Sequence, residues 1–296
     1  MIILNEKEYV QEHYLKAHEV DDKPYITLSL LAKYYYFCDG YRKKKIKELL
    51  TDYLSSYYYA RYIASKYTWD ETIDRIASKA GKYELYEFDC VWITETEIHV
   101  IDNIEDENMR LVAFSLLCLA KLGNLRSDKN NGWVNNDIKE IFELAGVKLN
   151  AVNRNYMLHD MMKLGLLEFP QKTGNLSSRV TFIDDNAKKV LSVSDFRALG
   201  NEYLFYKGKS YVRCAECGLL VPKKTATRYC PSCAANNTYY VPMEIKSVAC
   251  VDCGKMFTVS AKNNKTCRCD ECQAIYRRNY QKELMRERRN KVSITT

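Results

Sequence analysis

The first 60 residues carry hydrophobic positions at a helical spacing. Two segments show this spacing, ITLSLLAKYYYF (26–37) and YRKKKIKELLTDYLSSYYY (41–59), and the turn signal Cys38-Asp39-Gly40 separates them. The pattern predicts a helical hairpin. A third helix is expected near residues 69–80, and the following run YELYEFDCVWI (83–93) is rich in residues that favour strands. We therefore expect residues 1–94 to form a helical N-terminal domain.

Residues 105–183 predict three helices followed by two strands. The strongly apolar segment NMRLVAFSLLCLAKLG (108–123) reads as a helix that stops at Gly123. Asn136-Asp137 is expected to cap the helix DIKEIFELAGV, and Asn150 the helix AVNRNYMLHDMMK, which Gly165 closes. The runs LLEFP and SSRVTFI, joined by the glycine-containing turn QKTGN, read as a hairpin.

This order of elements, together with the stretch LHDMMKLGLLEF (158–169), resembles a winged helix, and we assign it to residues 95–185. The resemblance implies that the third helix lies in the DNA major groove and that the hairpin tip reaches the backbone or minor groove. The residue types suit base and backbone contacts. The candidates are Asn153, Arg154, Asn155, Tyr156, Lys172 and Arg179. Because this helix also carries Asp160 and is not strongly basic, docking on another protein stays open as its role.

The net charge of +7 is concentrated in the last third of the chain. Residues 201–296 hold 18 Lys/Arg and 8 Asp/Glu, a formal +10, whereas residues 1–200 hold 27 and 30, a formal −3. A basic tail on an otherwise acidic chain indicates a polyanionic partner. Cysteine follows the same division, with nine of the twelve between positions 214 and 272. The other three, Cys38, Cys90 and Cys118, lie in apolar surroundings and are expected to fill the core.

The nine clustered cysteines contain two complete metal-ligand sets. Each has the layout CxxCG, a lysine-bearing segment, and CxxC, and the second set repeats the first after 36 residues. Four thiolates at this spacing point to two structural Zn²⁺ ions, and the layout resembles tandem zinc ribbons, at 210–238 and 246–292. The ligands are Cys214, Cys217, Cys230, Cys233, Cys250, Cys253, Cys269 and Cys272. Cys267 could replace Cys269, but its spacing of four residues to Cys272 favours Cys269. A redox role for the CxxC pairs is the lesser alternative.

The second set runs into a basic segment, QAIYRRNYQKELMRERRNK (273–291). We expect a helix that the metal anchors at one end and that contacts phosphates through Arg277, Arg278, Lys282, Arg286, Arg288 and Arg289. A solvated terminal helix is the plainer interpretation. The arrangement of CxxCGxxF, basic hairpin, CxxC and arginine-rich end resembles DNA-binding proteins of bacterial phages and mobile elements.

Other candidate features have plainer interpretations. The basic run Arg42-Lys43-Lys44-Lys45 with Lys47 can contact phosphate or form a solvated helix face, and part of the tyrosine triplets 34–36 and 57–59 must be core. The acidic group at Glu95, Glu97, Asp102, Glu105 and Asp106 could form a carboxylate metal site, but a solvated helix start is the plainer interpretation. No catalytic motif is recognised, and an all-cysteine site leaves no open metal position, so we expect no enzymatic activity.

The sequence as a whole predicts an α+β protein, mainly α, made of a helical N-terminal region, a winged helix and two small four-cysteine zinc ribbons. Its expected role is a non-enzymatic DNA-binding protein of the cytoplasm, a transcription regulator or replication accessory factor of a phage or other mobile element. Double-stranded DNA is the first expected partner, and RNA follows. The alternative is an adaptor that docks on transcription or replication proteins. No membrane span or signal peptide is expected.

Overall fold

A computed structural model describes residues 2–170, 177–224, 227–236, 245–260 and 266–292 of the chain. The chain divides into two compact units, Met1–Cys233 and Ala234–Thr296, and each is described by itself. Its described part is mainly helical, with small antiparallel sheets and two four-cysteine groups, which confirms the predicted fold class. None of the helices in that part is long and apolar enough to cross a membrane.

The N-terminal helices of the first unit share one hydrophobic core, and we call them the helical body. The predicted hairpin is present, and the third expected helix starts three residues early. Its elements are α1 (Glu6–Tyr9), a π-helical turn (Val10–Lys16), α2 (Pro24–Phe37), α3 (Lys43–Tyr57), α4 (Tyr59–Ala64) and α5 (Lys66–Lys79). Tyr34, Tyr35 and Tyr58 are buried, which confirms that part of each tyrosine triplet is core.

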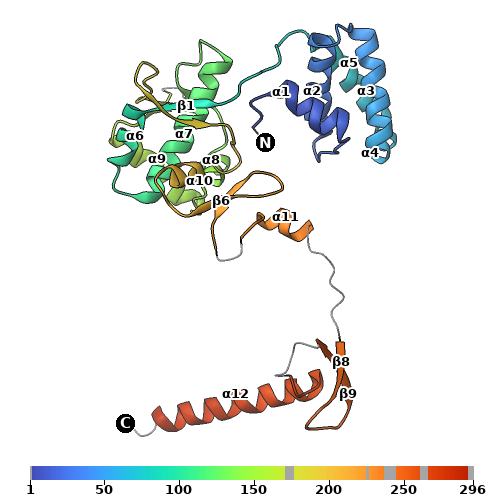
Figure 1. The fold of residues 1–296 in the computed structure, drawn as a ribbon, viewed down its shortest axis with the longest axis vertical. Helices are drawn as coiled ribbons and strands as arrows, with labels where there is room; N and C mark the ends of the chain where they lie inside the picture. Colours follow the sequence, from blue (N-terminus) through green and yellow to red (C-terminus); the bar gives the residue numbers. More distant parts are fainter. Residues whose placement is uncertain (1, 171–176, 225–226, 237–244, 261–265, 293–296) are drawn as a thin grey trace. The chain divides into compact units, whose positions relative to one another are not determined.

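A second core in the same unit surrounds α7 (Glu107–Arg126), shown in green in Figure 1. Every side chain from Leu111 to Leu122 is buried, so this helix is covered all round, as its nearly continuous apolar sequence requires. The elements packed around it form the central body. They are β1 (Val91–Thr94), α6 (Glu95–Asp102), β2 (Trp133–Val134), α8 (Ile138–Ala145), α9 (Ala151–Lys163), β3 (Leu167–Glu168), β4 (Ser178–Val180), β5 (Lys189–Val193) and α10 (Leu199–Tyr206).

Within the central body, the predicted order of three helices and a hairpin is present as α7, α8, α9, β3 and β4. The strands β3 and β4 are antiparallel, and β2, between α7 and α8, adds a third strand in the order β2-β4-β3. The predicted caps are also present: Asp137 accepts from the N–H of Lys139, and Asn150 from the N–H of Asn153.

The predicted helix stop at Gly123 is wrong, because α7 continues to Arg126. A Cβ at this position would lie 2.5 Å from the Nδ2 atom of Asn130. That same nitrogen donates to the Oδ1 atom of Asn124 and to the carbonyl of Trp133. The glycine therefore provides room for a side chain that ties the loop after α7 to the helix.

Two parts of the central body were not expected from the sequence. The strand predicted over 83–93 forms only at Val91–Thr94, where it pairs with β5 from nearly 100 residues further along the chain. The helix α10 then packs against α7, with Tyr203 buried at the contact. The core around α7 thus takes in residues outside the range 95–185.

The acidic group expected on a solvated helix start is partly structural instead. Glu97 is fully buried and closes a capping box with Thr94 at the start of α6. Its Oε1 atom lies 2.7 Å from the Nζ atom of Lys121 on α7, and it also accepts from the backbone N–H of Asp184. Asp102 accepts from Tyr203 and pairs with Lys207. These carboxylates therefore join α6 to the rest of the central body.

The Glu97–Lys121 pair generates a stability prediction. We expect Lys121→Met to lower the free energy of unfolding by about 3 to 5 kcal/mol, because it leaves a buried carboxylate without its cation. The matched change Lys139→Met removes an exposed pair with Glu143 and should cost about 1 kcal/mol or less. Urea unfolding of both variants checks this. Equal effects would contradict a stabilising role for the buried pair.

Candidate metal centres and nucleic-acid interface

The first four-cysteine group is built at the end of a short hairpin, β6 (Tyr211–Arg213) and β7 (Leu220–Pro222). Between the strands, the chain turns so that the N–H of Gly218 donates to the carbonyl of Cys214. Gly218 has a φ of +72°, a conformation that suits glycine, and the tight turn brings the sulfurs of Cys214 and Cys217 together. Cys230 and Cys233 arrive from the start of α11 (Pro231–Asn236).

The second group repeats this construction in the second unit, on the hairpin β8 (Ile245–Ala249) and β9 (Met256–Ser260). Gly254 also has a φ of +72°, and its N–H donates to the carbonyl of Cys250. The other two cysteines come from the start of α12 (Asp270–Val292). Cys269 immediately precedes this helix and Cys272 lies in its first turn.

The sulfur positions in both groups suit a tetrahedral metal site. Within each group, the four Sγ atoms lie within 4.8 Å of one another. The Sγ atoms of Cys217 and Cys230 are 3.7 Å apart, and so are those of Cys253 and Cys269. Four thiolates at a Zn–S distance of about 2.3 Å on a tetrahedron would be about 3.8 Å apart. Each group can thus hold one metal ion, and its donor set and geometry fit Zn²⁺.

Backbone N–H groups favour a thiolate in each group. The N–H of Cys217 lowers the pKa of the Cys214 thiol to about 6, and the N–H of Cys269 lowers that of Cys250 to about 6. Hydrogen bonding to Cys230 raises the pKa of the Cys233 thiol to about 12. Because thiolates are the metal-binding form, one ligand of each group is ready at neutral pH and others give up a proton as the metal binds.

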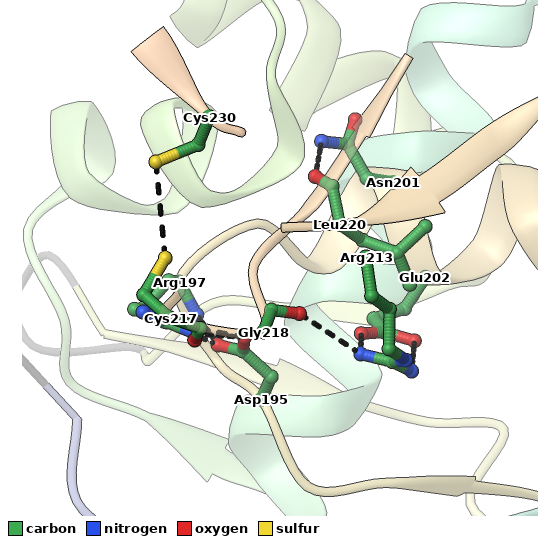
Figure 2. Close-up of polar contacts among 9 residues, drawn as sticks. All are labelled: Asp195, Arg197, Asn201, Glu202, Arg213, Cys217, Gly218, Leu220 and Cys230. Atoms are coloured by element: carbon green, nitrogen blue, oxygen red, sulfur yellow. Dashed lines mark hydrogen bonds and ion pairs between the residues drawn. The ribbon is translucent and has the colours of Figure 1, made fainter. Parts of the chain in front are cut away.

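The first group is fixed to the central body by Arg197, which lies between β5 and α10 (Figure 2). Its Nη2 atom donates to the carbonyl of Cys217 at 2.7 Å and pairs with Asp195 at 2.6 Å. Burial opposes ionisation of Asp195, but the hydrogen bonds from Arg197 outweigh it and lower the pKa of that carboxyl. The Arg197–Asp195 pair therefore holds the turn between Cys214 and Gly218, which we call the first knuckle, in place.

The hairpin behind this knuckle is attached to α10 by two further contacts, also drawn in Figure 2. Arg213 on β6 donates to both carboxylate oxygens of the buried Glu202, at 3.3 Å each. The side-chain amide of Asn201 donates to the carbonyl of Leu220 on β7 at 2.8 Å. The first ribbon is thus a fixed part of the first unit.

The second group is joined to α12 through Arg268. Its Nε atom pairs with Asp252, in the turn between Cys250 and Gly254, at 2.7 Å. Its guanidinium lies 4.2 Å from the ring centroid of Tyr276 on the helix. The ring of Tyr276 stacks in turn with that of Tyr280, one turn further along. These contacts extend the anchoring of α12 from its first turn into its second and third.

Beyond its first turn, α12 presents a basic surface and leaves the hairpin as a single long helix (Figure 1). Arg278, Lys282 and Arg286 are exposed and repeat every four residues, so they line one face of the helix at intervals of about 6 Å. Arg277 is exposed beside this row, which we call the basic stripe. Arg288 and Arg289 lie further along the same helix, outside the described side chains.

The other predicted contact residues lie on the central body. Asn153, Asn155 and Tyr156 are exposed on α9, whereas Arg154 is half-buried and its Nε atom has no hydrogen-bond partner among the described residues. Arg179 lies on β4, but its guanidinium donates to Glu168 and twice to Asn131, so most of its donors are already used. Lys172 lies outside the described residues.

The structure also bears on Cys267, the alternative ligand, and on three arginines that the sequence analysis did not single out. Cys267 is exposed and lies outside the sulfur group, and its carbonyl accepts from the N–H of Val251. The sulfur geometry therefore favours Cys269 as the ligand. Arg197, Arg213 and Arg268 were missed as supports of the two groups. A weak signal existed for Arg268 and Arg213, since each directly precedes a ligand cysteine.

The two groups predict a metal content. We expect protein made with zinc available to carry two zinc ions per chain, as elemental analysis will measure. Cys267→Ser should leave that number unchanged, whereas Cys269→Ser should lower it or weaken retention of one ion against a chelator. The reverse ranking of the two variants would show that Cys267 is the ligand.

Comparisons with known proteins assign this chain to no family. No family model, curated protein or solved structure matches it. Three features of the chain bear on its function: two four-sulfur groups, a basic helix that starts at one of them, and the exposed residues of α9.

Proposed function

We propose that this chain is a non-enzymatic nucleic-acid-binding protein that contacts double-stranded DNA through α12, held at its start by a structural zinc ion. The carrying observation is the basic stripe, which is exposed and begins two turns after a four-cysteine group. A duplex carries a dense row of phosphates, and cations aligned along a helix can replace its counterions. A helix that is already formed also loses less conformational entropy on binding.

The central body supports a second contact in this proposal. Three helices, a strand between the first two, and a hairpin in the order β2-β4-β3 follow the layout of a winged helix, with α9 in the place of the recognition helix. Exposed Asn153 and Asn155 have side-chain amides that suit bidentate contacts with adenine. In this reading α12 provides affinity and α9 provides sequence preference. Such a division suits a regulator or replication accessory factor of a phage or mobile element.

One observation favours the alternative, an adaptor that docks on another protein. Val152 and Tyr156, four residues apart on α9, and Leu164 at its C-terminal end each expose more than half of their surface. Exposed apolar side chains are typical of protein interfaces, and the helix carries a formal charge of only +1, because Lys163 pairs with Asp160 and Arg154 remains. Under this alternative the basic stripe binds an acidic protein surface.

Reversing the charge of the basic stripe tests the proposal directly. We expect the triple variant Arg278→Glu, Lys282→Glu, Arg286→Glu to weaken binding to all duplexes alike. The slope of log affinity against log salt should flatten by about 0.9 for each lost phosphate contact. Fluorescence anisotropy over a salt series measures both quantities. The control variant reverses Lys16, Lys66 and Lys139, which are exposed elsewhere, and equal losses in the two triples would contradict a specific role for α12.

Substitutions on α9 test the reader role separately. Asn153→Ala or Asn155→Ala should reduce discrimination among duplex sequences by about 1 to 3 kcal/mol per lost bidentate contact, with little change in the salt slope. Selection from a pool of random duplexes measures this preference. If both variants select the same sequences as the wild type, α9 does not recognise the base sequence. That result would favour the alternative in which the protein docks on another protein.

A further inference from the structure

The helical body contains an open surface pocket of about 600 Å³ at one end of the bundle. It forms where the start of α3, the end of α5 and the loop after α5 meet. Its lining has four cationic side chains and one aromatic ring and includes no carboxylate. The residues that matter are Tyr36, Arg42, Lys43, Lys79, Gly81 and Lys82, and we call them the cationic pocket.

The walls of this pocket are held by packing. Tyr36 lies so close to Gly81 that a Cβ there would be 2.4 Å from its ring, so the glycine is needed for the ring to occupy this place. The guanidinium of Arg42 lies 5.1 Å from the ring centroid of Tyr36, which fixes one cation against the wall. Lys43 pairs with Asp74 on α5 at 2.9 Å and so ties α3 to α5.

The charges of this pocket are not balanced within the described part of the chain. Lys43 shares Asp74 with Lys47, whereas Arg42, Lys79 and Lys82 have no carboxylate within ion-pair distance among the described residues. Cations that converge on one pocket repel one another and focus a positive potential there. An anion that enters the pocket relieves this repulsion, and phosphate is the anion whose several oxygens can accept from more than one of these donors.

Three exposed aromatic residues that neighbour the pocket residues in sequence, outside the lining itself, point to the kind of phosphate compound that binds. In the chain, Phe37 follows Tyr36, Tyr41 precedes Arg42, and Tyr83 follows Lys82. Each of the three aromatic residues exposes between 39% and 56% of its surface. A small inorganic anion has no aromatic surface that could stack on these rings. A cationic groove combined with exposed rings is the arrangement that holds an unpaired nucleic-acid strand, with phosphates on the cations and bases stacked on the rings.

We infer that the cationic pocket binds a single-stranded segment of nucleic acid, through contacts separate from those of α12 with duplex DNA. Lys79 and Lys82 contact backbone phosphates, and Tyr41 and Tyr83 stack with the flanking bases. The protein then has a surface for an unpaired strand in addition to its duplex contacts. This combination suits a protein that acts where a duplex is opened.

The test compares matched pairs of variants in the full-length chain, with anisotropy of a labelled oligothymidylate as the readout. Lys79→Ala/Lys82→Ala should weaken its binding about tenfold or more at 0.1 M salt and lower the salt slope by about 0.7 per lost phosphate contact. Tyr41→Ala/Tyr83→Ala should weaken it about tenfold with the slope unchanged, because stacking displaces no counterions. Binding of duplex DNA should stay within about twofold for both pairs.

The controls make the same chemical changes at the other end of the bundle. Lys23→Ala/Lys66→Ala and Tyr59→Ala/Tyr67→Ala alter exposed residues near the starts of α2, α4 and α5 and should have little effect on single-strand binding. Inorganic pyrophosphate at matched ionic strength should not displace the oligonucleotide. Circular dichroism checks that all variants keep their helices.

Several results would overturn the inference. Pocket pairs no weaker than the control pairs, or a wild type that does not bind the oligonucleotide, would remove the pocket as a strand site. Displacement by micromolar pyrophosphate would reassign it to a small phosphate compound. Equal losses for duplex and single strand would show a general phosphate surface. None of these outcomes bears on the duplex contact of α12, which is tested separately by comparing reversal of the basic stripe with its control triple.

Discussion

Coordination of four thiolates is the constraint on which the second unit depends. Among its described residues, the only buried side chains are Cys250 and Cys269, two members of the sulfur group. The hairpin β8–β9, the knuckle and the start of α12 all meet at this point. A segment of this size has too little apolar surface to hold a fold by itself, whereas zinc supplies about 10 to 16 kcal/mol in small zinc modules. Metal binding at this group would take the place of a hydrophobic core.

The first group has the same sulfur geometry, but additional side-chain contacts attach it to the rest of its unit. Cys214 and Cys230 belong to a small cluster with Val221, and Arg197 and Arg213 attach the ribbon to the central body. Loss of metal there would leave those contacts and the hairpin behind them. In the second unit, the described contacts that would remain between the hairpin and the start of α12 are those of Arg268 with Asp252 and Tyr276 and the hydrogen bond from the N–H of Val251 to the carbonyl of Cys267. The two repeats thus serve different purposes: one extends the central body, and the other presents a helix.

The local features of the fold were largely predictable from the sequence. Helix periodicity, the Asp137 and Asn150 caps and the cysteine spacing are each determined by a few neighbouring residues. Pairing between residues far apart in the chain, as for β1 with β5 or Glu97 with Lys121, was not predictable. The local sequence around one partner does not indicate which distant residue it will contact. Gly123 misled for a related reason. A glycine near a helix end is typical of a stop, but here it accommodates Asn130, and only the folded loop shows this contact.

The candidate sites divide in the same way. The eight ligand cysteines could be identified because each pair is local in sequence, and the basic stripe because its residues share one helix. The cationic pocket could be recognised only in part. Arg42 and Lys43 were noted as a basic run, but Lys79 and Lys82 join them only through the packing of α5 on α3. Arg197, which supports the first ribbon, was equally hidden, since it acts on a cysteine 20 residues away.

We infer that the metal, and not the charge of the tail alone, makes α12 a nucleic-acid-binding helix. This role of the metal is tested most directly by the duplex affinity of the full-length variant Cys269→Ser/Cys272→Ser against Cys267→Ser, at matched salt and with reductant present. The first variant keeps every arginine and loses the site's formal charge of −2, which by electrostatics alone should strengthen binding to DNA. We predict instead that its affinity falls on the order of tenfold, because ordering of α12 must then accompany binding. Equal or tighter binding would mean that the tail acts as a flexible polycation, and would contradict the claim.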